Sequence, residues 1–340
     1  MTPRRAGLVG LAALLAVAGS MWLANQRHLE RETPHGALLL PGLRAQLNAV
    51  NEVRLQGAAG VATTLRRDAA GWSVAERRYE ADLPRLRRLL LDLADLRIVE
   101  EKTHDRARYP ILGVEDVRGP GAGGVRIDLA AGAQRWSLIV GKSAGADGSY
   151  VRVSGQDASY LARPQLGVTA SPQQWLATAL LDLPAATIRS ASVTLPGQPA
   201  YLFVRAAPTD GAKDANVPLV LQAPPRGREP RPDAPAATAA ALAGLALEDV
   251  QAAALQSAAG ERIARARFET VDGLTIELSG REDGPRRLVS LQASATTGAG
   301  EAARRQATAL GARLGGREFE IANYRYGNIF RPLEDLLKPR

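Results

Sequence analysis

The sequence contains no cysteine and few histidines, and both scarcities limit the chemistry open to the protein. Without cysteine the chain can form neither a disulfide framework nor a thiolate metal site. The histidines are His28, His35 and His104, and they do not lie at the spacing of metal ligands. The sequence therefore predicts no metal-ligating residues, and we assign no catalytic or cofactor-binding residues from it either.

Aromatic residues are also scarce, at 4% of the chain, whereas hydrophobic residues make up 46%. The cores must therefore consist mainly of leucine, valine, isoleucine and alanine. The 340 residues are enough for a short anchor and two domains of ordinary size. Because large side chains are rare, we expect Trp72, which lies on a predicted strand, to be buried as the anchor of one core.

Lysine occurs only four times, so arginine carries nearly all of the positive charge, and the formal net charge is +8. A basic balance can indicate binding to nucleic acid or to anionic lipid. Here the arginines alternate with aspartates and glutamates, and no run of basic residues resembles a nucleic-acid-binding arm. The pattern is typical of a solvated surface of mixed charge, and it predicts no nucleic-acid partner.

The N-terminal residues 1–28 predict a membrane anchor. Arg4 and Arg5 precede an uncharged stretch, residues 6–24, of about 19 residues, which as a helix would span roughly 28 Å, close to the thickness of the bilayer hydrocarbon. Trp22 stands where an interfacial aromatic residue is expected. The arginines favour an N-terminus inside the cell, so the rest of the chain is predicted to be exported.

A cleaved signal peptide is the alternative interpretation of the same segment, because residues 16–18 read Ala-Val-Ala and resemble a cleavage site. The apolar run continues past this site, which favours an anchor that is not cleaved. Both interpretations place the remaining chain outside the cytoplasm.

The exported part is predicted to fold as two α+β units, residues 38–165 and 173–338. In the first unit, alternating apolar and polar residues between glycine turns predict antiparallel strands at 51–57, 61–68, 71–77, 124–130, 134–141, 149–155 and 158–163. Leucines recur at helical spacing from Leu83 to Leu96 and predict the main helix of this unit, with Asp82 as its N-cap.

The second unit is predicted to repeat the order of strands, helix and strands. Strands are predicted at 186–197, 200–207, 217–223, 265–273, 274–281 and 286–294. The main helix is predicted over 236–255, a connecting helix over 173–184, and a solvated proline-rich loop over 223–235. We therefore predict an N-terminal transmembrane helix followed by two similar units of antiparallel strands, each with one main helix.

The stretch SLIVGKSAG, residues 137–145, is similar to two catalytic motifs but fits neither. A phosphate-binding loop needs a glycine where Trp136 stands, and it needs a helix directly afterwards. A serine-hydrolase elbow at Ser143 needs a helix after the serine and a histidine downstream, but no histidine follows His104. The stretch is therefore predicted to be a turn between two strands, and the protein is not predicted to be an enzyme.

Several short stretches resemble the bacterial family known as domain of unknown function 4340. They are the W-x-V strand at Trp72, Tyr79 with Asp82, EKT at 101–103, LGVED at 112–116, the Val140-Gly141 turn, Tyr150-Val151, WLATALLDLP, and the closing REFEIANYRYGNIFRPLEDLL. The resemblance covers most of residues 38–338, and the proline-rich loop is its main departure. It implies a membrane-tethered extracytoplasmic protein that is an auxiliary component of gliding-motility-type ABC transport systems, and it carries over no catalytic residues.

The sequence therefore predicts a non-catalytic accessory component of an ABC-type transport system, with a single span in the cytoplasmic membrane and most of the chain in the periplasm. Its expected partners are the membrane and the permease or auxiliary subunits of the transporter, and no small-molecule substrate or cofactor is identified. The alternative is a module that binds a cell-envelope polymer or lipid, whose anionic groups a basic surface would attract.

Overall fold

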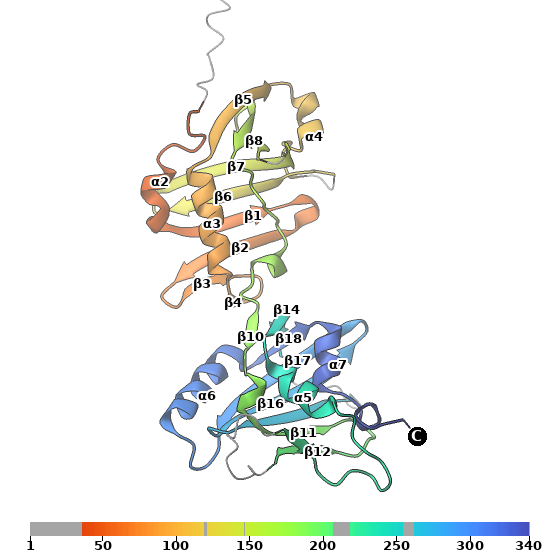
Figure 1. Cartoon of the computed structure of the whole chain (residues 1–340). Coiled ribbons are helices and arrows are strands. Elements are labelled where there is room, and N and C mark those ends of the chain that lie inside the picture. The colour runs from red at the N-terminus through yellow and green to blue at the C-terminus, as the bar shows by residue number, and fades with distance from the viewer. Residues whose placement is uncertain (1–35, 119–120, 146, 207–217, 254–261, 340) are drawn as a thin grey trace, which may run out of the picture. The chain divides into compact units, whose positions relative to one another are not determined.

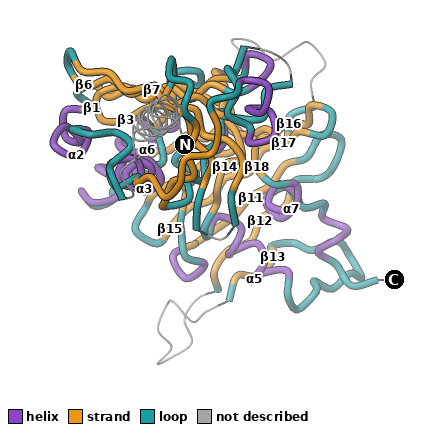
Figure 2. Tube along the Cα trace, turned by 90° about the horizontal axis from the view of Figure 1, so that it is seen from above, coloured by secondary structure: helices purple, strands orange, loops and turns teal. Residues whose placement is uncertain are grey.

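A computed structural model describes residues 36–118, 121–145, 147–206, 218–253 and 262–339 (Figures 1 and 2). The described chain is α+β, with two nine-stranded antiparallel sheets and several short helices. The predicted anchor, residues 1–28, lies outside the described residues. No helix in the described part is long and apolar enough to cross a bilayer.

Contacts divide the described chain into two compact units, residues 36–70 with 84–171 and residues 71–83 with 172–339. The predicted first unit, 38–165, was continuous. In the structure, the hairpin of residues 71–83 belongs instead with the second unit, because its backbone and side chains contact Trp175, Ala177, Asp249 and Phe319.

The first sheet has the strand order β4-β3-β2-β1-β6-β7-β8-β9-β5. The strands are β1 Val50–Gln56, β2 Ala62–Asp68, β3 Gly71–Val74, β4 Tyr79–Glu80, β5 Arg97–Thr103, β6 Val125–Ala131, β7 Gln134–Ser143, β8 Ser149–Val153 and β9 Ser159–Arg163. Every strand predicted for this part of the chain is confirmed, although β3 ends at Val74 and not at residue 77. These strands were predictable because buried and exposed residues alternate along them, as in β1 and β6, where one face of the sheet is packed and the other meets solvent.

The main helix of the first unit, α3 Leu83–Ala94, lies across one face of this sheet (Figure 1). Its buried side chains are at the predicted helical spacing: Leu86, Leu89, Leu90 and Leu93. Two helices of one turn, α2 Leu43–Gln46 and α4 Tyr109–Leu112, precede β1 and follow β5.

The second sheet has the order β10-β14-β18-β17-β16-β15-β11-β12-β13. The strands are β10 Ala179–Leu181, β11 Ile188–Thr194, β12 Tyr201–Arg205, β13 Leu219–Leu221, β14 Leu245–Ala252, β15 Ala264–Thr270, β16 Leu274–Asp283, β17 Arg286–Ala295 and β18 Arg317–Ile321. The strands predicted for this unit are present, and β10, β14 and β18 were not predicted.

Two helix predictions for the second unit were wrong. Of the predicted helix 236–255, residues 236–253 are described, and they form only the end of α5 Ala234–Ala239 and a 3₁₀ turn, Ala240–Leu242, before β14 begins. Residues 173–184 form most of a 3₁₀ turn, Pro172–Trp175, and then β10. The longest helix of the unit is α6 Glu301–Leu314, which was not predicted and packs against β17 and β16.

The two sheets nevertheless share one topology. The order β3-β2-β1-β6-β7-β8-β9-β5 in the first corresponds, strand by strand, to β13-β12-β11-β15-β16-β17-β18-β14 in the second. Among the corresponding strands of each sheet, three precede a helix in the sequence. The strand after the helix lies at or next to the far edge of the sheet, and the last four strands fill the space between it and the first strand. The predicted internal repeat is therefore present as a repeat of strand order.

Local details of β1 and β11 agree as well. A 3₁₀ turn ends directly before each strand, and each strand has a register shift after its first residue, where it pairs with β6 or β15. The buried positions also have the same spacing, namely Val50, Val53 and Leu55 in β1, and Ile188, Ala191 and Val193 in β11.

A tryptophan is fully buried in the core of the second unit, but it is Trp175 and not Trp72, the residue that we expected to anchor a core. Trp72 is only half-buried, whereas Trp175 is fully buried, with 0% of its surface exposed. The backbone carbonyl of Trp175 also accepts a hydrogen bond of 2.7 Å from the Asp82 amide, which ties the 71–83 hairpin to this core.

The proline-rich loop, 223–235, is fixed to the C-terminal segment, although its charged side chains are mostly solvated as predicted. Pro230 forms a β-bridge with Leu337, and the Arg231 amide donates to the Leu336 carbonyl at 2.8 Å. An ion pair between Lys338 and Glu229, at 2.6 Å, lies beside the bridge. The last apolar residues of the chain therefore pack within their own unit.

Candidate functional site

The glycine-rich stretch 137–145 forms the end of β7 and the turn toward β8, as predicted. The Ser143 hydroxyl donates to the Gly145 carbonyl at 3.0 Å and accepts from the Gln165 side-chain amide at 2.9 Å. His104, the last histidine of the chain, contacts Glu101 instead. The Ser143 hydroxyl thus holds the turn together and is not paired with a histidine base.

Gly141 allows β7 to pack against the turn at the end of α4. A methyl group at Gly141 would lie 2.3 Å from the Leu112 carbonyl oxygen and 2.8 Å from that of Gly113. The neighbouring Lys142 side chain donates to the Ile111 carbonyl at 2.9 Å. Two of the sequence motifs, LGVED and the Val140-Gly141 turn, are therefore two sides of one packing contact.

Arg152 holds the same turn from β8, and its side chain is only 5% exposed. Its guanidinium donates to the Val114 carbonyl at 2.8 Å and to the Asp116 carboxylate at 2.6 Å, and it lies over the Tyr109 ring. The hydrogen bond from Arg152 holds the pKa of Asp116 below its ordinary value. All of these groups have partners within the turn, so this motif region is best explained as a structural element.

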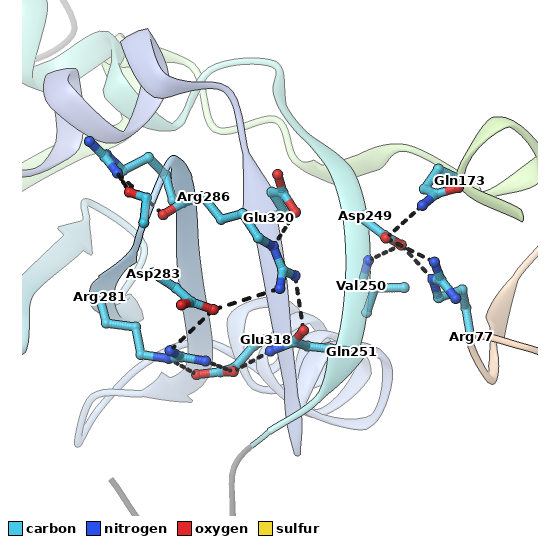
Figure 3. Close-up of polar contacts among 12 residues, drawn as sticks. Arg77, Gln173, Asp249, Val250, Gln251, Arg281, Asp283, Arg286, Glu318 and Glu320 are labelled. Atoms are coloured by element: carbon cyan, nitrogen blue, oxygen red, sulfur yellow. Dashed lines mark hydrogen bonds and ion pairs between the residues drawn. The ribbon is translucent and has the colours of Figure 1, made fainter. Parts of the chain in front are cut away.

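A polar cleft of about 890 Å³ lies in the second unit. It is lined by the tip of the β3–β4 hairpin, by β14, by the start of β17, and by the turn between α6 and β18. Figure 3 shows its network of charged side chains. The arginines of the lining are Arg77, Arg78, Arg286 and Arg317, and the carboxylates are Glu76, Asp249 and Glu320. We take this cleft as the candidate functional site.

The alternation of side chains along β14 and β18 creates the polar floor of the cleft. Val250 pairs with Phe319 on the buried face, and both are less than 3% exposed. The neighbouring pair, Gln251 with Glu318, must then lie on the opposite face. Polar side chains are retained on this face because they bond one another, as Gln251 does with Glu318 and Arg286 with Glu320.

The hairpin tip is attached to this floor through Arg77. Its guanidinium makes two hydrogen bonds to the Asp249 carboxylate, at 2.6 and 3.0 Å. Asp249 also accepts from Gln173 at 3.1 Å and from the Val250 amide at 2.8 Å. Burial acts to raise the pKa of Asp249, but these hydrogen bonds outweigh it and hold the pKa below its ordinary value.

A second set of ion pairs links the strands below the cleft. Arg281 makes two hydrogen bonds of 2.8 Å to Glu318, and Gln251 donates to the same carboxylate at 3.0 Å. Arg286 bonds both Glu320, at 2.8 Å, and the Gln251 side-chain oxygen, at 2.9 Å. The hydrogen bonds from Arg281 outweigh burial and lower the pKa of Glu318. These pairs link β14, β18, β17 and β16 on the face opposite Val250 and Phe319.

Two arginines of the lining have no carboxylate partner within the described part of the chain. Arg317 donates to the carbonyls of Arg313, at 2.8 Å, and of Arg78, at 3.2 Å, and stacks over the Tyr79 ring. Arg78 is exposed and has a backbone φ of 51°, a dihedral that residues other than glycine rarely adopt. The cleft therefore presents two guanidinium groups, of Arg78 and Arg317, that form no ion pair within the described residues.

Sequence reasoning assigned no site residues, and it missed this cleft. Its polar side chains come from the hairpin tip at 76–78, from residue 173, from 249–251, from 286 and from 315–320. The one local signal was the alternation REFEI in β18, in which Glu320 lies between buried Phe319 and Ile321. The helix predicted over 236–255 concealed the matching alternation in β14.

Comparison with known proteins gives one match. A family model described as Domain of unknown function (DUF4340) matches residues 72–260, which is more than half of the chain. The matched residues include the hairpin tip, Gln173, Asp249 and Gln251 of the cleft, whereas β17 and β18 lie beyond them. No curated protein and no solved structure matches the chain.

Proposed function

Because the chain belongs to the DUF4340 family, we propose that it is a non-catalytic, extracytoplasmic accessory component of an ABC-type transport system, anchored in the cytoplasmic membrane. The observation that carries the proposal is the order of the chain, in which an uncharged segment of spanning length precedes two sheet-based units. Arg4 and Arg5 before that segment support an N-terminus inside the cell.

The packing of the motif residues supports a binding role over a catalytic one. Ser143 and Arg152, which stand in or beside the family-like motifs, use their polar groups to hold a turn. In the cleft, Asp249 and Glu320 are each paired with an arginine, so their charges position strands and the hairpin. A protein that binds a transporter needs such rigid surfaces, because a fixed interface loses less conformational entropy on association.

A second candidate function, binding of a cell-envelope polymer or lipid, is favoured by the positive charge at Arg78 and Arg317. Such ligands carry anionic groups that arginine recognises. Purification of the protein together with what it binds in the membrane separates the two functions. A transport partner would co-purify as protein subunits, whereas a polymer or lipid ligand would not.

The test is affinity purification of the tagged full chain from native membranes after mild solubilisation, with quantitative mass spectrometry. The expected result is enrichment of an ATP-binding subunit and a permease of one ABC system. The matched control carries Leu14→Arg and Leu15→Arg, which place two charges within the predicted span and should prevent insertion. Equal recovery with both proteins, or recovery of no ABC subunit, would contradict the proposal.

A further inference from the structure

We propose that the cleft of the second unit is a binding site for a small molecule that carries a carboxylate or phosphate group, and that Arg78 and Arg317 hold this group. The inference is separate from the transport role, because it rests on the chemistry of one unit. It concerns the purified protein and requires no partner.

The charge of the lining supports this assignment. Of its four arginines, Arg77 is neutralised by Asp249 and Arg286 by Glu320. Glu76, the remaining carboxylate of the lining, acts on Arg77 and raises the pKa of that guanidinium together with Asp249. Arg78 and Arg317 are left with carbonyl or solvent partners only, within the part of the chain that the structure describes.

The Arg317 guanidinium and the Arg78 backbone are held by contacts that do not pair either arginine with a carboxylate. Arg317 holds the Arg78 carbonyl, and Tyr79, which follows Arg78, packs edge-on against Phe319 with ring centroids 5.7 Å apart. The double hydrogen bond from Arg77 to Asp249 fixes the other side of the tip. A preorganised guanidinium loses little entropy when it binds an anion.

The backbone of Arg78 has a left-handed conformation at the end of the hairpin turn, where the Arg78 amide donates to the Ala75 carbonyl at 3.3 Å. A positive φ at a residue other than glycine costs on the order of 1–3 kcal/mol and persists only where surrounding contacts enforce it. Such residues cluster at ligand-binding and active sites. Here the strained conformation places the exposed side chain of Arg78 at the cleft, in the same lining as Arg317.

The dimensions and chemistry of the cleft indicate the ligand class. Its volume of about 890 Å³ lies within the range of small-molecule sites, and its lining is dominated by charged and amide groups. Guanidinium groups bind carboxylates and phosphates through paired hydrogen bonds. The ligand should therefore be a polar anion, with Arg286 and Gln251 available on the floor for further hydrogen bonds.

Isothermal titration calorimetry of the solubilised full chain tests the proposal, with inorganic pyrophosphate and citrate as probes of phosphate and carboxylate recognition. Saturable binding of at least one probe is expected, and the preferred probe identifies the anionic group. Arg78→Ala should weaken binding about 10- to 100-fold, the loss expected for one charge-assisted contact. This change keeps a non-glycine residue at φ 51° and removes an exposed side chain, so thermal unfolding should be unaltered.

Arg317→Ala should also weaken binding, whereas Arg304→Ala, which removes an exposed arginine of α6 outside the lining, should leave affinity unchanged. The proposal is overturned if neither probe shows saturable binding at millimolar concentration. It is equally overturned if Arg78→Ala binds as tightly as the unaltered protein. Neither outcome depends on membrane location or on an ABC partner, so this test can fail without affecting the proposed function.

Discussion

Individual ion pairs in the second unit join segments that are far apart in the sequence. The side chains of Arg77 and Asp249 are 25% and 17% exposed, and those of Arg281 and Glu318 are 20% and 11% exposed. Partly buried pairs of this kind have already lost much of their hydration, so removal of one partner leaves a charge that water cannot fully solvate. Their main effect is to specify which segments meet.

Glu318 provides a pH-dependent test at this scale. Its pKa in the folded protein is lowered from 4.5, chiefly by hydrogen bonds from Arg281. A carboxylate with a lowered folded pKa stabilises the protein above its unfolded pKa, and this stabilisation is lost as the pH falls through the folded value. The unfolding temperature should therefore decline as the pH falls below about 4.5, and Glu318→Gln should reduce that decline.

Thermal unfolding of the solubilised full chain across this pH range measures the effect. Glu301→Gln is the matched control, because Glu301 is an exposed glutamate of α6 with 75% of its side-chain surface accessible. The control should retain the pH profile of the unaltered protein. A Glu318→Gln profile that is identical to the control profile would show that the Arg281–Glu318 pair contributes nothing measurable.

Trp175 provides a second prediction at the residue scale. Trp175→Ala should destabilise the second unit by about 3–5 kcal/mol, because it removes a fully buried aromatic side chain and leaves a cavity. Trp72→Ala should cost less, since Trp72 is half-buried. Thermal unfolding compares the two variants directly. A larger loss of stability for Trp72→Ala than for Trp175→Ala would contradict the burial of Trp175 in the structure and support the sequence-based expectation for Trp72.

At the scale of secondary-structure elements, strands with strict alternation were predictable and those rich in alanine were not. β14, LALEDVQA, buries Leu245, Leu247 and Val250, but its small residues and the alanines before it also satisfy a helical pattern. Pairing with β10 and β18 decides in favour of a strand. Conversely, α6 buries only Ala303, Ala307 and Leu314, so its sequence lacks the apolar stripe that reveals α3.

The cleft could not be predicted either, because it depends on pairing between strands that are far apart in the sequence. Its floor depends on β14 and β18 being adjacent strands, although about 70 residues separate them in the sequence, and on their register. Its wall depends on a turn between α6 and β18, in which Gly316 has a φ of 71°. Only long-range pairing brings these elements together, and residue pattern within one segment does not contain that information.

The contact between β7 and the turn after α4 is testable at the same scale. Gly141→Ala places a methyl group 2.3 Å from the Leu112 carbonyl oxygen, so the turn must move away from the strand. Overpacking of this kind costs about 1–3 kcal/mol. Thermal unfolding should show lower stability than for Gly167→Ala, a position where a methyl group meets nothing within 4 Å. Equal unfolding temperatures would contradict the described packing.

At the scale of the whole molecule, the two sheets repeat one strand order but differ in what connects the strands. Residues 154–158 form a short turn between β8 and β9, whereas residues 296–316 between the corresponding β17 and β18 contain α6. This larger connection contributes the glycine turn and leads directly into Arg317. The cleft thus depends on a connection that contains α6 and that the first sheet lacks. The two sheets therefore share a strand order without sharing this site.

The proposed function depends on where these two units are located. In the proposed topology both units follow the predicted span, residues 6–24, and lie on the same side of the membrane. We propose that Arg4 and Arg5 lie inside the cell, which makes that side the periplasm. An accessory component in this location can reach only the extracytoplasmic surface of a permease, and the cleft can meet only extracytoplasmic anions.

A pair of reporter fusions after Arg340 in a bacterial host tests this account most directly. Alkaline phosphatase, which is active only outside the cytoplasm, and a reporter that is active only inside it are each joined to the full chain, and their activities are normalised to expression. The account predicts an active phosphatase fusion and an inactive cytoplasmic reporter, with both phosphatase activity and membrane association reduced by Leu14→Arg and Leu15→Arg. An inactive phosphatase with an active cytoplasmic reporter would contradict it.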